Sequence, residues 1–288
     1  MTAPNASTDM QSLTTVAIVS IGEMGMGIAQ LLIAHNYQVM TFAEDRSERT
    51  KQNARAAGVK LMPTLESLAN DAEVVLSIVP PGDAFGTAER LAKAVSVRQA
   101  PLYYIDLNAT SPTTAKRIAA LFESHVNIVL IDGGIIGGVP RPLSDSQGWS
   151  TQINGTTVAL SDSGAERPTW HCPSLLVSGP TKLPDPQLSK ILNIDHINSE
   201  IGAATGVKMC FAATTKGFIS LVIQSYTTAH QLGVLENLRG YLAKFNPNTH
   251  KIAENGLVSM PPKAYRWVGE MLEIGDTFET EGNFESTL

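Results

Sequence analysis

Cysteine, clustered histidine and basic charge are all scarce in this chain. It has two cysteines and six scattered histidines among 288 residues, which excludes a disulfide framework and a CxxC or paired-histidine metal site. We expect Cys172 and Cys210 to be reduced core residues. Charged residues make up 17% and the net charge is −6, so no basic surface is available for a nucleic-acid backbone.

Long apolar segments are scarce as well. Residues 1–13 are polar and lack the apolar core of a signal peptide, and we expect them to form a loose tail. No apolar run reaches the length of a membrane span. These absences predict a cytoplasmic protein that binds neither nucleic acid nor membrane, without a metal.

What the chain does contain is a globular composition with alternating elements in its first half. Hydrophobic residues make up 43%, and the length suffices for two ordinary domains. Apolar, β-branched runs alternate with helical stretches, which is typical of a parallel sheet with helices on both faces. The expected strands are 15–20, 38–42, 60–62, 73–79, 102–106 and 128–132. The expected helices are 27–35, 48–57, 64–70, 84–94 and 113–124.

The pattern changes after Gly138. Residues 140–170 are rich in Pro, Ser, Asp and Gly, and predict loops with one strand at 156–160. Residues 201–225 are apolar almost all round, which predicts a buried helix. Two more helices are expected, near 226–245 and 262–281.

The first strand ends in a glycine turn. In a Rossmann fingerprint, G-x-G-x-x-G follows a strand and opens a helix, whose amides hold a pyrophosphate. Here Ser20 replaces the first glycine, Gly22 and Gly25 occupy the second and third places, and Glu23 and Met24 lie between them. Gly22 would let the backbone approach the phosphates, and Gly25 would let the helix pack on the strand.

These features predict an α/β protein with two domains. We expect an N-terminal Rossmann domain, with a doubly wound parallel sheet, over residues 14–185. An all-α substrate domain is expected over residues 186–288.

The turn after the second strand selects the cofactor. An acid about 20 residues past the glycines would hold a ribose 2′-hydroxyl and favour NAD, whereas an arginine would hold a 2′-phosphate and favour NADP. The sequence offers both, in Glu44 and Asp45 and in Arg46 with Ser47. The alternative is a solvated charged turn. We favour NADP(H), with NAD(H) as the other possibility.

Five segments in order resemble the β-hydroxyacid dehydrogenases, the superfamily of 6-phosphogluconate and 3-hydroxyisobutyrate dehydrogenases that also includes imine reductases. They cover most of residues 15–225 and comprise 22–25, 79–81, 106–112, 132–138 and 202–208. The C-terminal part, with 263–267 and 270–271, resembles the short helical domain of a little-characterised, phosphogluconate-dehydrogenase-like branch.

The resemblance implies roles for residues that follow the fourth and fifth strands. Val79, Pro80 and Pro81 would flank the dinucleotide, and Asn108 would lie near the nicotinamide ribose. Simpler interpretations are a strand terminator for the prolines and, for Asn108, a place just before a helix start. The two interpretations are compatible.

Lys208 is the candidate catalytic residue. It lies on an otherwise apolar helix, where burial lowers the pKa of an ammonium and suits it to general acid–base work. By resemblance, it handles the proton of the substrate hydroxyl; the alternative is a lysine that extends to solvent. Lys216 lies eight positions on, about 80° away around an α-helix, and either lines the same cleft or faces water.

Two positions depart from the family pattern. The substrate loop normally reads Ser-Gly-Gly, but here Ile136 precedes Gly137 and Gly138. Ala212 stands where the family has a substrate-positioning asparagine. Both changes remove polar contacts, so we expect a larger or less polar substrate, or a different carbonyl or imine chemistry.

The resemblance thus implies an NAD(P)-dependent dehydrogenase or reductase that transfers hydride between nicotinamide and a hydroxy or oxo carbon of a small molecule. A homodimer through the helical domain is implied too. Two alternatives stay open: an imine reductase, against which Lys208 argues, and an NADP-binding protein that has lost catalysis, for which Ile136 and Ala212 argue. Residues 141–171, with Trp149 and Trp170, form either a lid or, as we prefer, a surface loop.

Overall fold

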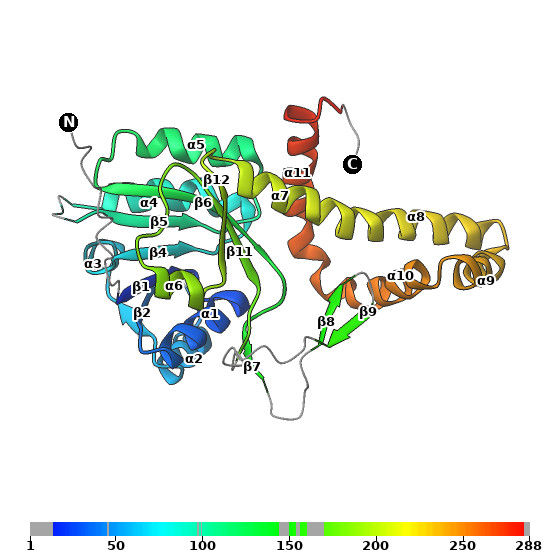
Figure 1. Ribbon diagram of the computed structural model, residues 1–288, viewed down its shortest axis with the longest axis horizontal. Coiled ribbons are helices and arrows are strands. Elements are labelled where there is room, and N and C mark those ends of the chain that lie inside the picture. The colour runs from blue at the N-terminus through cyan, green and yellow to red at the C-terminus, as the bar shows by residue number, and fades with distance from the viewer. Residues whose placement is uncertain are drawn as a thin grey trace, which may run out of the picture.

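A twisted eight-stranded sheet forms the body of the protein (Figure 1). The structure is a computed structural model that describes residues 14–284 except 45, 97, 99, 144–149, 154–155 and 160–169. The strand order is β3-β2-β1-β4-β5-β6-β11-β12, and β1 to β6 are parallel. Their bounds are β1 Thr15–Val19, β2 Gln38–Phe42, β3 Lys60–Met62, β4 Val74–Ser77, β5 Leu102–Asp106 and β6 Ile128–Ile136. The predicted Rossmann fold class is confirmed.

Helices cover both faces of the sheet because successive strand residues point to opposite sides. In β1, Val16 and Ile18 join one apolar cluster while Ala17 joins the other. The first cluster includes residues of α1 (Glu23–Ala34), α2 (Glu48–Ala56) and α6 (Pro186–Ile191). The second includes residues of α3 (Leu65–Asp71), α4 (Ala84–Ala94) and α5 (Pro112–Phe122).

The sheet gains two strands that the sequence analysis did not predict. β11 (Ser174–Ser178) runs antiparallel to β6, and β12 (Ile194–Asn198) pairs in parallel with β11. The sheet thus includes a strand beyond the predicted boundary at 185, and that boundary stays a prediction.

The segment between β6 and β11 contributes short hairpin strands. β7 (Arg141–Pro142) pairs with β10 (Trp170–His171), and β8 (Ser150–Ile153) pairs with β9 (Thr156–Ala159). The strand expected at 156–160 is therefore confirmed at β9. Trp149 lies outside the described residues, so the choice between lid and surface loop stays open.

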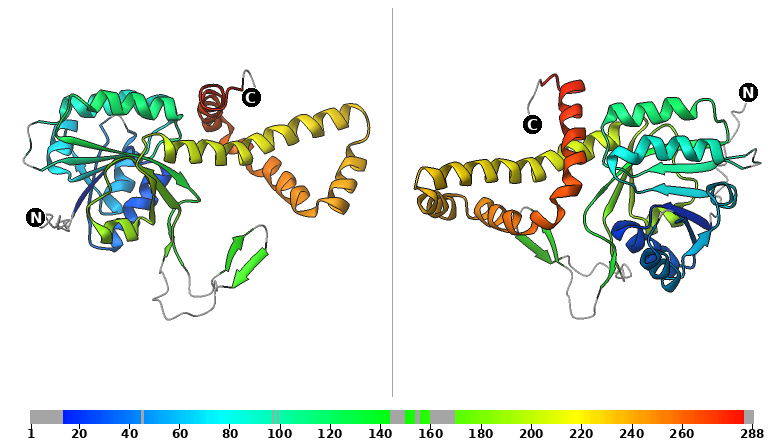
Figure 2. Two further views of the ribbon diagram at one scale, coloured as in Figure 1. Left: turned by 45° about the horizontal axis from the view of Figure 1, so that its top comes forward. Right: turned by 180° about the vertical axis from the view of Figure 1, so that it is seen from behind.

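The C-terminal part is a helical arm that extends away from the sheet (Figures 1 and 2). One continuous helix forms its spine, and two shorter helices fold back beneath it before a last helix crosses the spine near the body. The elements are α7 Ala203–Ala212, η2 Ala213–Gly217, α8 Phe218–Gln231, α9 Leu235–Phe245, α10 Pro247–Ser259 and α11 Ala264–Thr280, with η3 Pro261–Lys263 before α11.

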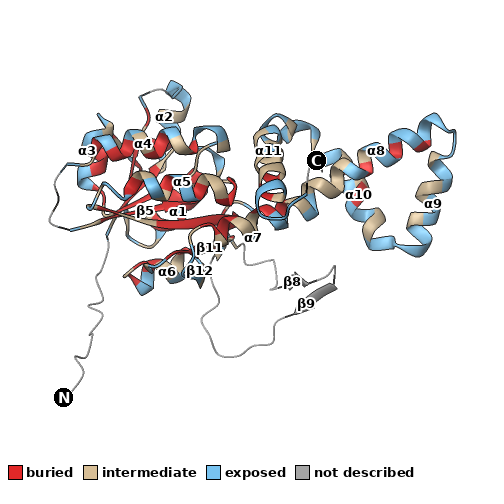
Figure 3. Cartoon of the chain, turned by 90° about the horizontal axis from the view of Figure 1, so that it is seen from above, coloured by how far each residue is buried: buried red, intermediate tan, exposed pale blue. Residues whose placement is uncertain are grey.

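The expectations for the spine helix and for the two cysteines were wrong. The spine is not a buried helix: Leu221 is 59% exposed, and Figure 3 shows the arm mostly in the colour of exposed residues. The helix runs over 29 residues, Ala203–Gln231, and contains an 18-residue window with a mean hydropathy of 1.3, so it is long and apolar enough to cross a membrane by length and composition alone. Cys210 is exposed and Cys172 is partly exposed, so neither is a core residue. The α8 part of the spine is exposed because the spine leaves the body after α7 (Figure 1).

Candidate functional site

The glycine turn has the backbone geometry of a phosphate-binding loop. Gly22 precedes α1, whose N-terminus has no side-chain cap, and a Cβ at Gly22 would meet nothing within 4 Å. The first amides of α1 therefore face open space, where they can hold an anion. A Cβ at Gly25 would lie 2.7 Å from the carbonyl oxygen of Ser20, so only glycine lets the helix approach the strand this closely. Glu23 is exposed and Met24 partly so.

Ser20 shows why a glycine usually stands at the first fingerprint position. Its φ is 70°, in the left-handed region that residues other than glycine rarely adopt. Its hydroxyl accepts a hydrogen bond of 3.1 Å from Nη2 of Arg46, which lies after β2. The hydroxyl of Ser47, a predicted cofactor residue, caps α2 by accepting a hydrogen bond from the amide of Thr50. Glu44 is exposed on the same turn.

The strand ends beside this turn are joined by Asn108. Its Oδ1 accepts from the amide of Val79 at 2.6 Å, and its Nδ2 donates to Oγ of Ser77 at 3.0 Å. The buried amide thus fixes the end of β4 against the end of β5. Pro80 is exposed next to these ends, and Pro81 opens the short helix η1 (Pro81–Asp83).

Lys208 lies where α7 crosses β6. Its Nζ donates to the carbonyl oxygen of Ile135 at 2.6 Å, and burial lowers the pKa of this ammonium. A Cβ at Gly134 would come within 2.8 Å of the Lys208 Cβ, so that glycine makes room for the lysine. An ammonium with a lowered pKa releases its proton more readily than an exposed lysine does.

Asp132 was not predicted from the sequence, yet it orients the helix that carries Lys208. Its buried carboxylate accepts from Oγ of Ser178 at 2.8 Å and from the amide of Gly202 at 2.9 Å. It also accepts from the hydroxyl and amide of Thr205. Because these amides are the first of α7, Asp132 ties the start of that helix to β6. The available signal was an acid directly before the Gly133-Gly134 pair.

Lys216 shares the face of the spine that carries Lys208. It lies in η2, a π-helical turn, which takes up one extra residue relative to an α-helix. The eight-residue separation therefore acts as seven, and the angular offset falls from about 80° to about 20°. Burial, together with the nearby Lys208 and Arg266 cations, lowers the pKa of Lys216 to about 8. The Glu270 carboxylate, which contacts its Nζ, acts in the opposite direction.

The predicted substrate-binding positions are not all brought together. Ile136 ends β6 and is partly buried, and Gly137, with a φ of 125°, and Gly138 follow it on the surface. Ala212, by contrast, is 2% exposed and packs with Met209 and with Ile274 of α11. Ala212 therefore faces another helix instead of an open cleft.

Helix α11 lies across both the spine and the cofactor-side loops. Glu273 accepts from the amide of Ser111 at 2.6 Å, at the start of α5. Arg266 lies 3.8 Å from the carboxylate of Glu23 at the glycine turn, and Trp267 lies against Lys216, with 5.4 Å from Nζ to the ring centre. The C-terminal helix thus supplies part of the wall around Lys208 and Lys216.

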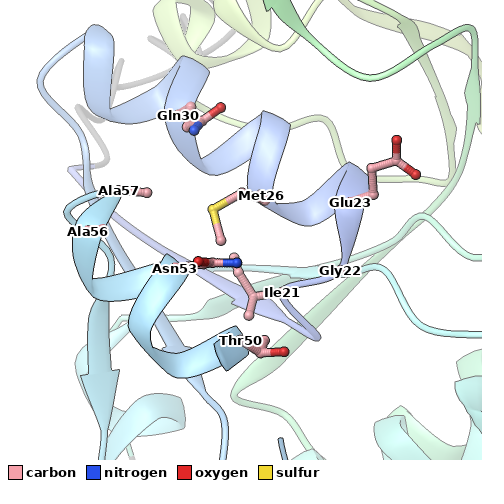
Figure 4. Close-up of a pocket in the computed structure, with 9 residues that line it drawn as sticks. All are labelled: Ile21, Gly22, Glu23, Met26, Gln30, Thr50, Asn53, Ala56 and Ala57. Atoms are coloured by element: carbon pink, nitrogen blue, oxygen red, sulfur yellow. The ribbon is translucent and has the colours of Figure 1, made fainter. Parts of the chain in front are cut away.

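A cavity of about 600 Å³ lies between α1 and α2 (Figure 4). Met26, Thr50 and Asn53 line it, and Glu23 points away from the other side chains. It opens beside the glycine turn but contains none of the residues around Lys208. A smaller cavity at the ends of β1, β2 and β4, lined by Ser20 and Arg46, is where a Rossmann fold binds its nucleotide.

Sequence and fold comparisons agree with this geometry. Residues 15–144 match the NAD binding domain of 6-phosphogluconate dehydrogenase, and residues 229–288 match a domain of unknown function, DUF1932. A conserved protein of unknown function, whose structure is described as similar to 3-hydroxyacid dehydrogenases, is 26% identical with a TM-score of 0.63, over 92% of this chain and 89% of that one.

Two further solved structures share the fold at lower identity. A 3-hydroxyisobutyrate dehydrogenase of Salmonella typhimurium is 17% identical with a TM-score of 0.62, over 93% of this chain and 88% of that one. An imine reductase of Myxococcus stipitatus in complex with NADP⁺ is 15% identical with a TM-score of 0.57, over 86% of this chain and 77% of that one.

The fold and the glycine turn thus define a dinucleotide-binding Rossmann protein with a helical C-terminal arm. The chain combines a match to the NAD binding domain of 6-phosphogluconate dehydrogenase with a C-terminal match to DUF1932, and its fold is similar to that of 3-hydroxyacid dehydrogenases.

Proposed function

We propose that this protein is an NAD(P)-dependent oxidoreductase that interconverts a hydroxy and an oxo carbon of a small molecule, with Lys208 as general acid/base. The observation that carries the proposal is the partly buried Lys208, whose Nζ is held by the Ile135 carbonyl beside the substrate loop. The residues fit a dinucleotide, because the uncapped amides of α1 lie at the ends of the parallel strands.

Each group has a defined part in the reaction. When bound, the nicotinamide donates or accepts a hydride. Lys208 Nζ gives a proton to the substrate oxygen during reduction and takes it during oxidation. Its lowered pKa lets the ammonium release the proton more readily than an exposed lysine. Asn108, held by Val79 and Ser77, keeps the two strand ends in register beside the nicotinamide half of the site.

Three finer points belong to the proposal. Arg46, within the nucleotide cavity, supports NADP(H) as the preferred cofactor. The protein acts in the cytoplasm on a small molecule.

A second copy of the chain covers the arm, where Leu221, Leu232 and Leu238 line an open apolar groove between α8 and α9. Sedimentation measures the oligomeric state of the wild type and of Leu221→Glu. A dimeric wild type that Leu221→Glu converts to a monomer supports the proposed dimer, and a monomeric wild type contradicts it.

The experiment compares the wild type with Lys208→Met, and Lys251→Met on the exposed face of α10 serves as control. Calorimetry with NADPH and NADH measures cofactor binding, and a panel of aldehydes, oxo acids and cyclic imines measures turnover. An oxidoreductase with Lys208 in the proposed role loses turnover at least about 100-fold in Lys208→Met while cofactor affinity changes little.

Other outcomes separate the alternatives. Turnover of imines that Lys208→Met leaves intact points to an imine reductase without lysine catalysis. Cofactor binding without turnover of any class indicates a binding protein. A folded wild type that binds neither dinucleotide refutes the proposal.

A further inference from the structure

A mostly buried ion pair joins the spine to the last helix beside Lys208. Nζ of Lys216 contacts the carboxylate of Glu270, and the two side chains are 15% and 19% exposed. Lys216 lies in the π-helical turn η2, and Glu270 lies in α11, which crosses the spine near the body (Figure 1). The pair therefore belongs to the wall that α11 adds around Lys208.

Three cations meet in this region, and each has a partner. Lys208 donates to a backbone carbonyl, Arg266 lies 3.8 Å from the carboxylate of Glu23, and Lys216 contacts Glu270. Their closeness shows in Lys216, whose pKa falls to about 8 because of burial and then because of the Lys208 and Arg266 cations. The acid that pairs with Lys216 is thus in place before a substrate arrives.

This ion pair decides which substrate charge the site accepts. A substrate carboxylate would have to displace Glu270 from Lys216, and an acid held on the same chain has a higher effective concentration than a small molecule in solution. A second carboxylate beside Glu270 would also meet repulsion from a like charge, in a partly buried place where water screens little. The site therefore disfavours an anionic substrate group next to Lys208.

The same pair favours an uncharged group that donates a hydrogen bond. A carboxylate has about four acceptor positions, so the contact with Lys216 leaves room for a substrate hydroxyl on Glu270. Apolar groups stand nearby, because Trp267 lies against Lys216, with 5.4 Å from Nζ to the ring centre, and Ile136 follows the carbonyl that holds Lys208. A neutral molecule with a hydroxyl and an apolar part fits these surroundings.

We propose that the Glu270–Lys216 ion pair makes the site selective for an uncharged oxo or hydroxy compound that carries a further hydroxyl group, over the anion of an oxo or hydroxy acid. The inference rests on the proposed function and deepens it, because it names the class of substrate. Glu270 is the specificity-determining residue, and Lys208 keeps its part in proton transfer.

The test compares kcat/KM for matched pairs of substrates, with NADPH and with NADH. In each pair a hydroxymethyl group replaces the carboxylate of an oxo acid, as in hydroxyacetone against pyruvate, and the pairs range over chains of three to six carbons. Glu270→Gln keeps the shape and removes the charge, and Glu279→Gln, exposed on the same helix, is the matched control.

The expected result is a change in the ratio between the two members of a pair. The wild type favours the uncharged member at least about tenfold, and Glu270→Gln shifts the ratio toward the acid at least about tenfold, because Lys216 becomes free to hold the carboxylate. Glu279→Gln changes the ratio less than about twofold.

Two further variants separate charge selection from a structural role. In Lys216→Met the Glu270 carboxylate remains and still repels an anion, so the preference for the uncharged member persists. In the double variant Lys216→Met/Glu270→Gln the gain for the acids disappears, because the cation that would hold them is gone. A purely structural pair would lower kcat/KM equally for both members in all three variants, and melting temperatures report whether each variant is folded.

The outcomes distinguish this inference from the proposed function. A wild type that favours the oxo acids, or a ratio that Glu270→Gln leaves unchanged, overturns the charge selection while the oxidoreductase proposal stands. A gain for the acids that persists in the double variant overturns the part assigned to Lys216. A folded wild type that binds neither dinucleotide, or that turns over neither member of any pair, overturns both proposals.

Discussion

Asp106 makes the stability of this protein depend on pH. The carboxyl lies at the end of β5 and is 4% exposed. Its Oδ1 accepts from the amide of Asn108 at 3.0 Å, whereas its Oδ2 has no partner within the described part of the chain. Burial, and then the nearby Asp132 carboxylate, raise the pKa of Asp106 from 3.8 to about 7, although the Asn108 amide opposes the shift.

The sign of the effect follows from proton binding. Because the folded pKa lies above the unfolded one, the folded state binds more protons between pH 4 and pH 7. The free energy of unfolding therefore contains a contribution that is complete below pH 4 and is lost as the pH rises to about 7. A shift of about three pKa units corresponds to about 4 kcal/mol as an upper limit, since relaxation of the folded state reduces it.

Asp106→Asn isolates this contribution, because the amide has the shape of the carboxyl and cannot ionise. Urea unfolding at pH 5, 6, 7 and 8 gives the difference between variant and wild type, and Asp195→Asn, on the exposed side of β12, is the control. We expect Asp106→Asn to gain about 1–3 kcal/mol over wild type between pH 5 and pH 8. A difference that stays constant over this range would refute the reasoning.

Three further predictions test the packing of the site. Gly25→Ala destabilises the fold by about 2–4 kcal/mol and abolishes dinucleotide binding, because its Cβ meets the Ser20 carbonyl. The control Gly86→Ala, on α4, adds a Cβ that meets nothing and stabilises the fold by up to about 1 kcal/mol. Melting temperatures measure the stability of both variants, and calorimetry measures their dinucleotide binding. Asp132→Ala leaves several buried donors unpaired and lowers the free energy of unfolding by about 3–5 kcal/mol in urea, and an unchanged midpoint contradicts this. Glu273→Ala removes the acceptor of the Ser111 amide, so we expect faster hydrogen exchange in α11 and unchanged exchange in β5. Equal exchange rates of α11 in the wild type and the variant would refute the idea that this hydrogen bond holds α11 against α5.

The parallel core could be predicted because its signal is local. The strands that became β1 to β6 are continuous apolar runs, and their expected bounds agree with the structure within a few residues at most ends. β11 and β12 were not predicted because their segments, SLLVS and IDHIN, are short and their assignment depends on pairing with a distant strand. Helix α10 was not predicted because its thirteen residues, PNTHKIAENGLVS, include few apolar residues with a clear period.

The candidate site divides in the same way. The glycine turn and Lys208 are readable because each stands out within a short segment. The contact between Ser20 and Arg46 spans 26 positions, and that between Asp132 and Thr205 spans 73. Such pairs follow from the strand order and not from any spacing in the sequence. The side of the spine taken by Lys216 depended on one π-helical turn, which the regular 3.6-residue period cannot anticipate.

Ala212 illustrates how a local comparison can mislead. By resemblance it marks the loss of a substrate-positioning asparagine, and so favours a protein without catalysis. In the structure its side chain is buried against Ile274 of α11, within a cluster that also contains Met209. An asparagine there would bury its amide among apolar groups at a cost of about 1–3 kcal/mol. Alanine is therefore what the docking of α11 requires, and the substitution gives no independent reason to infer lost activity. α11 also brings Glu270 to Lys216, so the helix that excludes the asparagine supplies a polar group of its own beside the spine.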